Sequence, residues 1–272
     1  MGRASPGSAR LVSAFNAATA VTRRDDGDVY DVELDLGWSI GGKPNGGYLL
    51  AILARAATKA VDRPHPLAVS GHFLRPPDGG PAEVRVEVVK AGRTVSTVRS
   101  TLWQHDKPCL DSLVTVGELT GKPVDYAAES APVLPTPEEC RSRADTPFKV
   151  ELLDHIDVLI DPDTSPFPTP TGHPMIQGWM RFRDGADADA HALALAVDAM
   201  PPTVFHLEKL GWAPTVELTF LLRGVPAPGW LSFRAEATFV ADGWFDESAT
   251  VWDSTGRLVA QSRQLALLGR SS

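Results

Sequence analysis

The spacing of apolar residues predicts one buried helix in the first quarter of the chain. From residue 48 to residue 61 good helix formers predominate, and apolar residues recur at helical spacing. Only Arg55, Thr58 and Lys59 interrupt the apolar surface. We therefore expect most of the circumference of this helix to be buried.

The start of this helix carries a candidate binding feature. Asn45 is a suitable N-cap, and Gly46 and Gly47 leave the first backbone amides uncovered by side chains. Amides at a helix N-terminus can receive a carbonyl or phosphate oxygen. The alternative is a core helix that begins with a Gly-Gly turn and binds nothing.

Alternating apolar and polar residues predict strands on both sides of the helix. The predicted strands cover residues 30–36, 68–74, 84–88, 94–104 and 109–118. Strand, long helix and several antiparallel strands in this order indicate a sheet wrapped around one helix. After a proline-rich segment without a sustained period, residues 175–182 again predict a strand and residues 191–210 a mainly helical region, which Pro201 and Pro202 must begin or break.

An internal repeat indicates that the second half copies the first. Shifting the sequence by 149 residues lays residues 83–116 over residues 232–265 without a gap. The identical pairs include Arg85 with Arg234, Glu87 with Glu236, Thr101 with Thr250 and Trp103 with Trp252. The identities are few, and chance is the alternative. Together with the proline-rich segment, the repeat predicts an N-terminal unit over residues 1–119, a linker over 120–147 and a C-terminal unit over 148–272.

Composition, charge and absent motifs exclude several classes of partner and enzyme. The chain has 272 residues and a formal charge of -8, which argues against a general nucleic-acid or anionic-membrane surface. Cys109 and Cys140 match no metal-ligand spacing, and no apolar run approaches 18 residues. We therefore expect a cytoplasmic protein without metal, nucleic-acid or membrane partners. The motifs of serine hydrolases, zinc proteases, Walker nucleotide-binding proteins and dinucleotide-binding proteins do not occur.

Four segments in a fixed order resemble the type II acyl-CoA thioesterases of the thioesterase-like superfamily. They are Asn45-Gly46-Gly47, His72-Phe73-Leu74-Arg75-Pro76, Val197-Asp198, and Gly256-Arg257-Leu258-Val259-Ala260 leading to Gln264. The resemblance covers about residues 25 to 268. It implies an α+β double hot dog fold, in which two tandem units, each an antiparallel sheet wrapped around a central helix, pack into one continuous sheet.

The resemblance also implies a catalytic set, in which an Asp, a Thr or Ser, and a Gln of the second unit activate water. These residues match Asp198, Thr215 and Gln264, with Thr219 replacing Thr215 if the register slips. From the residues alone, Asp198 is the only acidic residue within residues 193–204, where burial would raise its pKa; the alternative is an N-cap of the next helix. The residues that follow Asp198 and Thr215 differ from those expected in the best-known members.

The sequence therefore predicts a cofactor-independent acyl-CoA thioesterase of lipid metabolism. Asp198, Thr215 and Gln264 are its expected catalytic residues, and Asn45, Gly46 and Gly47 are expected to bind substrate. One alternative is a non-hydrolytic acyl-CoA or acyl-carrier binding protein on the same fold. Another is a different hot dog enzyme such as a hydratase, although the expected Asp/His pairing is not evident. Because hot dog sheets commonly associate, a homo-oligomer is expected.

Overall fold

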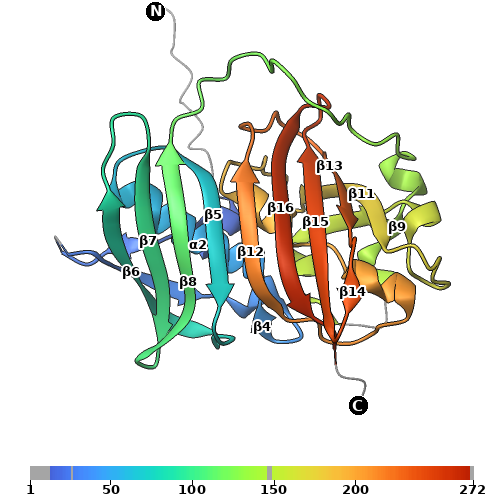
Figure 1. The fold of residues 1–272 in the computed structure, drawn as a ribbon, viewed down its shortest axis with the longest axis horizontal. Coiled ribbons are helices and arrows are strands. Elements are labelled where there is room, and N and C mark those ends of the chain that lie inside the picture. The colour runs from blue at the N-terminus through green and yellow to red at the C-terminus, as the bar shows by residue number, and fades with distance from the viewer. Residues whose placement is uncertain (1–12, 26, 146–148, 270–272) are drawn as a thin grey trace, which may run out of the picture.

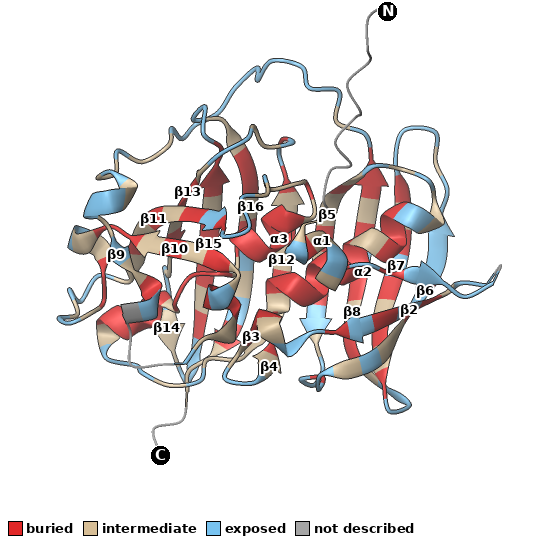
Figure 2. Ribbon diagram, turned by 180° about the vertical axis from the view of Figure 1, so that it is seen from behind, coloured by how far each residue is buried: buried red, intermediate tan, exposed pale blue. Residues whose placement is uncertain are grey.

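One long antiparallel sheet forms the frame of the molecule, with the helices on one of its faces (Figures 1 and 2). The computed structural model describes residues 13–25, 27–145 and 149–269. The helices are α1 (Ala14–Ala18), α2 (Gly46–Ala60) and α3 (Ala192–Ala196), with 3₁₀ turns at Leu36–Trp38, Pro137–Glu139, Arg143–Asp145, Glu151–Asp154, Pro162–Thr164 and Thr203–Leu207. Among the described residues, no helix is long and apolar enough to span a membrane.

The strands fall into two sets. The N-terminal strands are β1 (Thr22–Arg23), β2 (Val29–Leu34), β5 (His65–Phe73), β6 (Gly80–Lys90), β7 (Ser96–Gln104) and β8 (Lys107–Gly117), with a small hairpin of β3 (Ser39–Ile40) and β4 (Lys43–Pro44). The C-terminal strands are β9 (Arg141–Ser142), β10 (Ile156–Ile160), β11 (Met175–Phe182), β12 (Thr215–Leu222), β13 (Leu231–Glu236), β14 (Val240–Ala241), β15 (Trp244–Trp252) and β16 (Leu258–Leu267).

The two sets meet at one seam and share a single sheet. The strand order is β1-β2-β6-β7-β8-β5-β12-β16-β15-β13-β11-β10-β9, with β14 paired to β15. At the seam, antiparallel β5 and β12 pair from His72–Glu217 to Ala68–Leu221. The predicted tandem arrangement in one continuous sheet is confirmed.

The sequence repeat corresponds to equivalent strands on the two sides of the seam. The order β6-β7-β8-β5 on one side is mirrored by β12-β16-β15-β13 on the other. Arg85 lies over the ring of Trp103 at 3.9 Å, and Arg234 lies over the ring of Trp252 at 5.8 Å. The residues paired by the repeat thus form the same cation–π contact in both halves.

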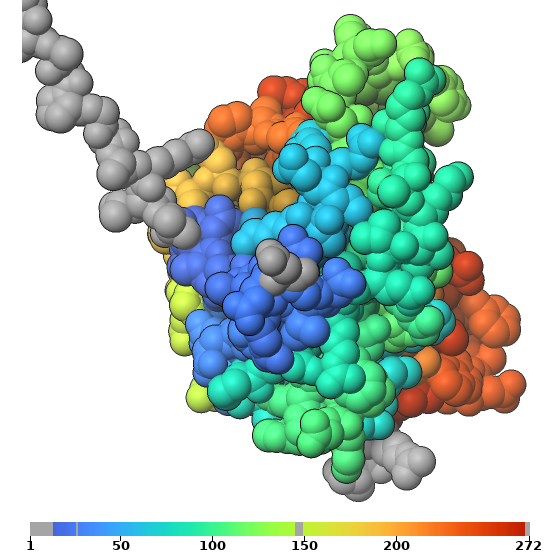
Figure 3. All heavy atoms as spheres, turned by 90° about the vertical axis from the view of Figure 1, so that its left-hand side faces the viewer, coloured from blue at the N-terminus to red at the C-terminus, as the bar shows by residue number. Residues whose placement is uncertain are grey.

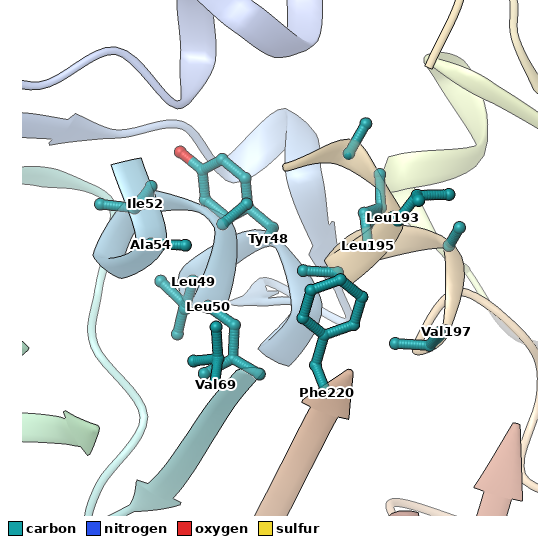
Figure 4. Close-up of a cluster of buried hydrophobic side chains, with 14 of the residues drawn as sticks. Tyr48, Leu49, Leu50, Ile52, Ala54, Val69, Leu193, Leu195, Val197 and Phe220 are labelled. Carbon is teal, nitrogen blue, oxygen red and sulfur yellow. The ribbon is translucent and has the colours of Figure 1, made fainter. Parts of the chain in front are cut away.

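Helix α2 is the buried helix that the apolar spacing predicted. Asn45 is its N-cap, accepting the N–H of Tyr48 at 3.0 Å, and Leu50 and Ile52 are completely buried. Figure 4 shows Val69 of β5 and Phe220 of β12, which pair across the seam, pointing toward α2 and α3. Burial of each such side chain contributes about 1.5–3 kcal/mol, so this apolar cluster holds the two halves together.

The second helical region is shorter than predicted. Helix α3 has five residues, and the chain then turns at Val197 and Asp198 before the 3₁₀ turn Thr203–Leu207. The prediction of a mainly helical region over residues 191–210 is therefore wrong in extent. Pro201 and Pro202 prevent continuation, because proline removes a helical hydrogen bond and clashes with the preceding turn.

The predicted linker crosses one end of the molecule after β8 (Figures 1 and 3). Residues 118–136 contain no helix or strand. Strand β9 and the following 3₁₀ turn nevertheless lie inside the 120–147 segment, and β9 pairs with β10 of the C-terminal half. The predicted boundary at residue 147 lies outside the described residues, as do the first 12 residues of the N-terminal unit.

Gly47 allows α2 and α3 to touch backbone to backbone. A Cβ atom at this position would lie 2.2 Å from the backbone oxygen of Ala194 and 2.9 Å from the Cα of Leu195. Neither atom can move without shifting α3. This contact fixes the start of α2 beside the turn that carries Asp198.

We expect Gly47→Ala to destabilise the protein by about 1–3 kcal/mol in urea unfolding, because its methyl group overpacks the helix contact. In an exposed helix interior without that contact, alanine would stabilise the protein by about 0.8–1.0 kcal/mol relative to glycine. A loss of stability in Gly47→Ala therefore indicates the close contact, and a gain argues against it. Gly27→Ala is the control, since its Cβ meets no described atom closer than 3.4 Å. A Gly47→Ala variant as stable as the wild type would contradict the close contact.

Candidate active site

A cavity of about 660 Å³ lies where the two halves meet. Its polar lining includes residues from the start of α2, the 3₁₀ turn Arg143–Asp145, the turn after α3, β12, β15 and β16; they are Asn45, Arg143, Asp198, Thr215, Glu247 and Gln264. Its apolar lining includes Leu49, Phe73, Val197, Met200, Phe205 and Phe245. The expected catalytic residues therefore surround one space, together with Asn45 and Gly46 of the first half.

The Asp198 carboxylate is bound to the N-terminal end of α2. Its Oδ2 accepts the backbone N–H of Gly47 at 2.8 Å and the Nδ2 of Asn45 at 2.9 Å. The same Nδ2 donates to the backbone oxygen of Asp198 at 3.0 Å. A helix N-terminus stabilises negative charge, so the first half of the chain holds the carboxylate of the second.

These bonds change the role of the glycine pair. The N–H of Gly47, expected to face substrate, is already donated to Asp198. Gly46 lines the cavity, and its N–H occupies the first helical position, where amides have no intrahelical partner. A Cβ at Gly46 would lie 3.0 Å from Asp198 Oδ2, so this position also keeps the carboxylate uncrowded.

Burial raises the pKa of Asp198 to about 6. The hydrogen bonds from Gly47 and Asn45 and the charge of Arg143 oppose this rise, whereas the charge of Glu247 adds to it. A carboxylate with a pKa near 6 is ionised at neutral pH and is a better proton acceptor than an ordinary aspartate.

A β-bulge places Thr215 on the cavity face of β12. The pairing with β16 shifts between Thr215 and Glu217, so Thr215 lies opposite Ala266, on the same face as Gln264. The Thr215 hydroxyl donates to Gln264 Oε1 at 2.7 Å. The fallback residue, Thr219, is not in the cavity lining, and its hydroxyl donates to Glu217 at 2.6 Å.

Glu247 is a cavity residue that the sequence reasoning missed. Its Oε1 accepts Gln264 Nε2 at 2.9 Å, and its Oε2 accepts both the N–H and the hydroxyl of Thr203 at 2.7 Å. A signal was present in β15, where Phe245, Glu247 and Ala249 occupy successive buried positions. A carboxylate at an inward strand position among apolar residues indicates a purpose, because burying a charge is costly.

Arg143 is the second missed residue, and it comes from the segment predicted to be a linker. The side chain is buried, and its guanidinium donates to the backbone oxygen of Ala199. Burial lowers its pKa to about 10, while the charges of Asp198 and Glu247 oppose that effect. Arg143 thus remains a cation beside two carboxylates, and nothing in its local sequence indicates this.

Within the described residues, no group of three or more His, Cys, Asp or Glu side chains is arranged to hold a metal ion.

Two family models match the chain over most of its length. One is the acyl-CoA thioesterase N-terminal domain, which matches residues 34–117, and the other is the acyl-CoA thioesterase C-terminal domain, which matches residues 137–268. The chain belongs to the acyl-CoA thioesterase family. Membership confirms the resemblance seen in the sequence and supports thioester hydrolysis as the reaction class.

Individual relatives and solved structures are similar to this chain over most of its length. An uncharacterised protein of Mycobacterium bovis is 34% identical, over 88% of this chain and 91% of its own length. A Thermobifida fusca structure assigned to thioesterase II is 42% identical and covers 96% of this chain and 99% of its own, with a TM-score of 0.87. A hot dog protein of unknown function from Alicyclobacillus acidocaldarius, 22% identical with a TM-score of 0.86, covers 96% of this chain and 100% of its own. The predicted α+β double hot dog fold is confirmed.

The raised pKa of Asp198 makes a prediction about stability. Between pH 3.8 and about 6 the folded protein holds a proton that the unfolded chain releases, so ionisation weakens the fold as the pH rises. Asp198→Asn escapes this penalty. We expect its stability relative to the wild type to increase between pH 4 and 6.5 by at most about 3 kcal/mol and then to level off.

Urea unfolding at several pH values measures this difference. Asp31→Asn is the control, because the hydrogen bond from Arg24 lowers the pKa of Asp31 below its usual 3.8. Its stability relative to the wild type should therefore fall with rising pH only below about pH 4 and stay level between pH 4 and 6.5. A relative stability of Asp198→Asn that falls with rising pH would show that the hydrogen bonds outweigh burial at Asp198.

Proposed function

We propose that the protein hydrolyses an acyl-CoA thioester to the free acid and CoA by direct attack of water, without a cofactor. The observation that carries this proposal is the Asp198 carboxylate, fixed on the start of α2 and lining the same cavity as the hydrogen-bonded pair Thr215 and Gln264. The family of the chain supports the reaction class, and the cavity supplies the groups that this reaction requires.

Hydrolysis of a thioester needs a positioned water, a proton acceptor and donors for the developing oxyanion. Both side-chain hydrogen bonds that Asp198 accepts end on Oδ2, so we assign Oδ1 to the water. Asp198 takes a proton as the water oxygen bonds to the carbonyl carbon. When the tetrahedral intermediate collapses, the C–S bond breaks and the proton passes to the departing thiolate.

The thioester carbonyl needs a donor that is not already engaged with Asp198. We assign the N–H of Gly46, because it lies at the first position of α2 and lines the cavity. The positive end of the helix stabilises the developing oxyanion. Asn45 and Gly47 then act by holding Asp198 rather than by binding substrate directly.

The lining of the cavity suits the two ends of an acyl-CoA. Apolar side chains from both halves can receive an acyl group. Lys43, Arg75 and Lys149 also line the cavity, and Arg75 and Lys149 are exposed. In a chain with a net charge of -8, cations at this place match the phosphates of CoA.

Thiol release from a panel of short, long and aromatic acyl-CoAs tests the reaction. We expect turnover by the wild type and a loss of about 10²-fold or more in kcat/KM for Asp198→Asn, because the proton acceptor is removed. Thr215→Val should lose about 10-fold or more, since a hydrogen bond to the water is gone. The matched control is Thr219→Val, a change outside the cavity that should leave kcat/KM within about two-fold.

Binding of acyl-CoA by the folded wild type without thiol release would replace hydrolysis by a carrier or binding role. Equal losses in Thr215→Val and Thr219→Val would contradict the assignment of Thr215.

The pH dependence of hydrolysis tests Asp198 separately. Because the ionised carboxylate is the active form, kcat/KM should fall as the pH drops through about 6, the pKa that burial gives Asp198. Initial rates measured between pH 4.5 and 8.5 would show this fall in kcat/KM. A profile without a fall between pH 7 and 5 would contradict Asp198 as the proton acceptor.

A further inference from the structure

Glu247 is a buried carboxylate with a complete set of partners, next to the proposed site. It lies in β15 directly opposite Gln264 of β16, and the residue is 6% exposed. Oε2 accepts the backbone N–H and the hydroxyl of Thr203, and Oε1 accepts Nε2 of Gln264 at 2.9 Å. The backbone N–H of Thr203 can only donate a hydrogen bond, so the atom that faces it must be an acceptor.

These contacts determine which way round the Gln264 amide sits. An ionised carboxylate only accepts hydrogen bonds, so Gln264 must turn its NH₂ group toward Glu247. Its carbonyl oxygen then faces Thr215, whose hydroxyl donates to it at 2.7 Å. A hydroxyl has one proton, so Thr215 can only accept a hydrogen bond from the cavity side.

We propose that Glu247 is a positioning residue that sets the hydrogen-bond polarity of the water site. Acting through the Gln264 amide, it makes the Thr215 oxygen an acceptor toward the cavity. The attacking water then donates one proton to Asp198 and the other to Thr215, which leaves a lone pair of the water for the thioester carbon. This inference rests on the proposed hydrolysis.

We take Glu247 to be ionised, because its two oxygens together accept three hydrogen bonds. Burial raises its pKa, while the donors of Thr203 and Gln264 and the charge of Arg143 lower it. The charges of Asp198, Glu247 and Arg143 act on one another. The other cations in the cavity lining are Lys43, Arg75 and Lys149. Replacing a buried carboxylate by its amide relieves desolvation, so a purely structural role predicts little effect on catalysis.

Glu247→Gln reverses the polarity while conserving shape. Its carbonyl oxygen must face the N–H of Thr203, so its NH₂ group faces Gln264 and the Gln264 amide flips. Thr215 then donates its proton into the cavity and competes with the water for Asp198. We expect kcat to fall about 10-fold or more, with KM within about three-fold and the urea midpoint unchanged or higher.

Two comparisons separate positioning from structure. Thr203→Val removes only the hydroxyl donor and should keep kcat within about three-fold, because the backbone N–H still holds Glu247. In a Gln264→Ala background, Glu247→Gln should change kcat by less than about two-fold, since the residue through which it acts is gone. If the double variant instead loses kcat by the product of the two single losses, the proposal is overturned.

These experiments distinguish a failure of the role proposed for Glu247 from a failure of the proposed hydrolysis. An active wild type with an equally active Glu247→Gln variant would overturn this inference and leave hydrolysis standing. A wild type without thiol release would instead overturn the proposed hydrolysis. If Glu247→Gln does not fold, side-chain amide NMR of the wild type tests the same point. The Gln264 NH₂ pair, identified by its loss in Gln264→Ala, should show one proton shifted downfield by the carboxylate, and its absence there would contradict the proposed orientation.

Discussion

The attachment of Asp198 to the first turn of α2 is the interaction on which the rest of the site depends. The N–H of Gly47 and the side chain of Asn45 belong to the first half of the chain, whereas Asp198 belongs to the second. The contact requires α2 and α3 to touch at Gly47, and that contact follows from the β5–β12 seam beneath them. Neither half alone could place this carboxylate, so the single continuous sheet is a condition of the site as well as of the fold.

The site concentrates buried charge at a cost to stability. Asp198 and Glu247 lie near one cation, Arg143, and burial raises the pKa of both carboxylates. Buried ion groups of this kind rarely stabilise a fold more than apolar residues of the same shape. In the proposed function their value lies in chemistry, because a carboxylate with a pKa of about 6 accepts protons at neutral pH and a second one fixes the hydrogen bonds around it.

The sequence predicted the features that depend on interactions between residues close together in the chain. The apolar spacing of α2, its Asn45 cap, the alternating strands and the tandem repeat all followed from the sequence and appear in the structure. The second helical region was predicted too long, although Pro201 and Pro202 mark its break. Thr215 reaches the cavity through a β-bulge that alternation alone does not foresee. Glu247 had a signal in its inward strand position, whereas Arg143 depends entirely on tertiary contacts.

In the proposed reaction, a water molecule held by Asp198 attacks the thioester directly. Repeated turnover in ¹⁸O-labelled water, followed by mass spectrometry of the released acid and of the peptide that contains Asp198, tests it most directly. Direct attack predicts one ¹⁸O atom in the newly formed carboxylate of the acid and none in the Asp198 side chain. Labelling of Asp198 would show that the carboxylate forms a covalent acyl intermediate and would contradict the account.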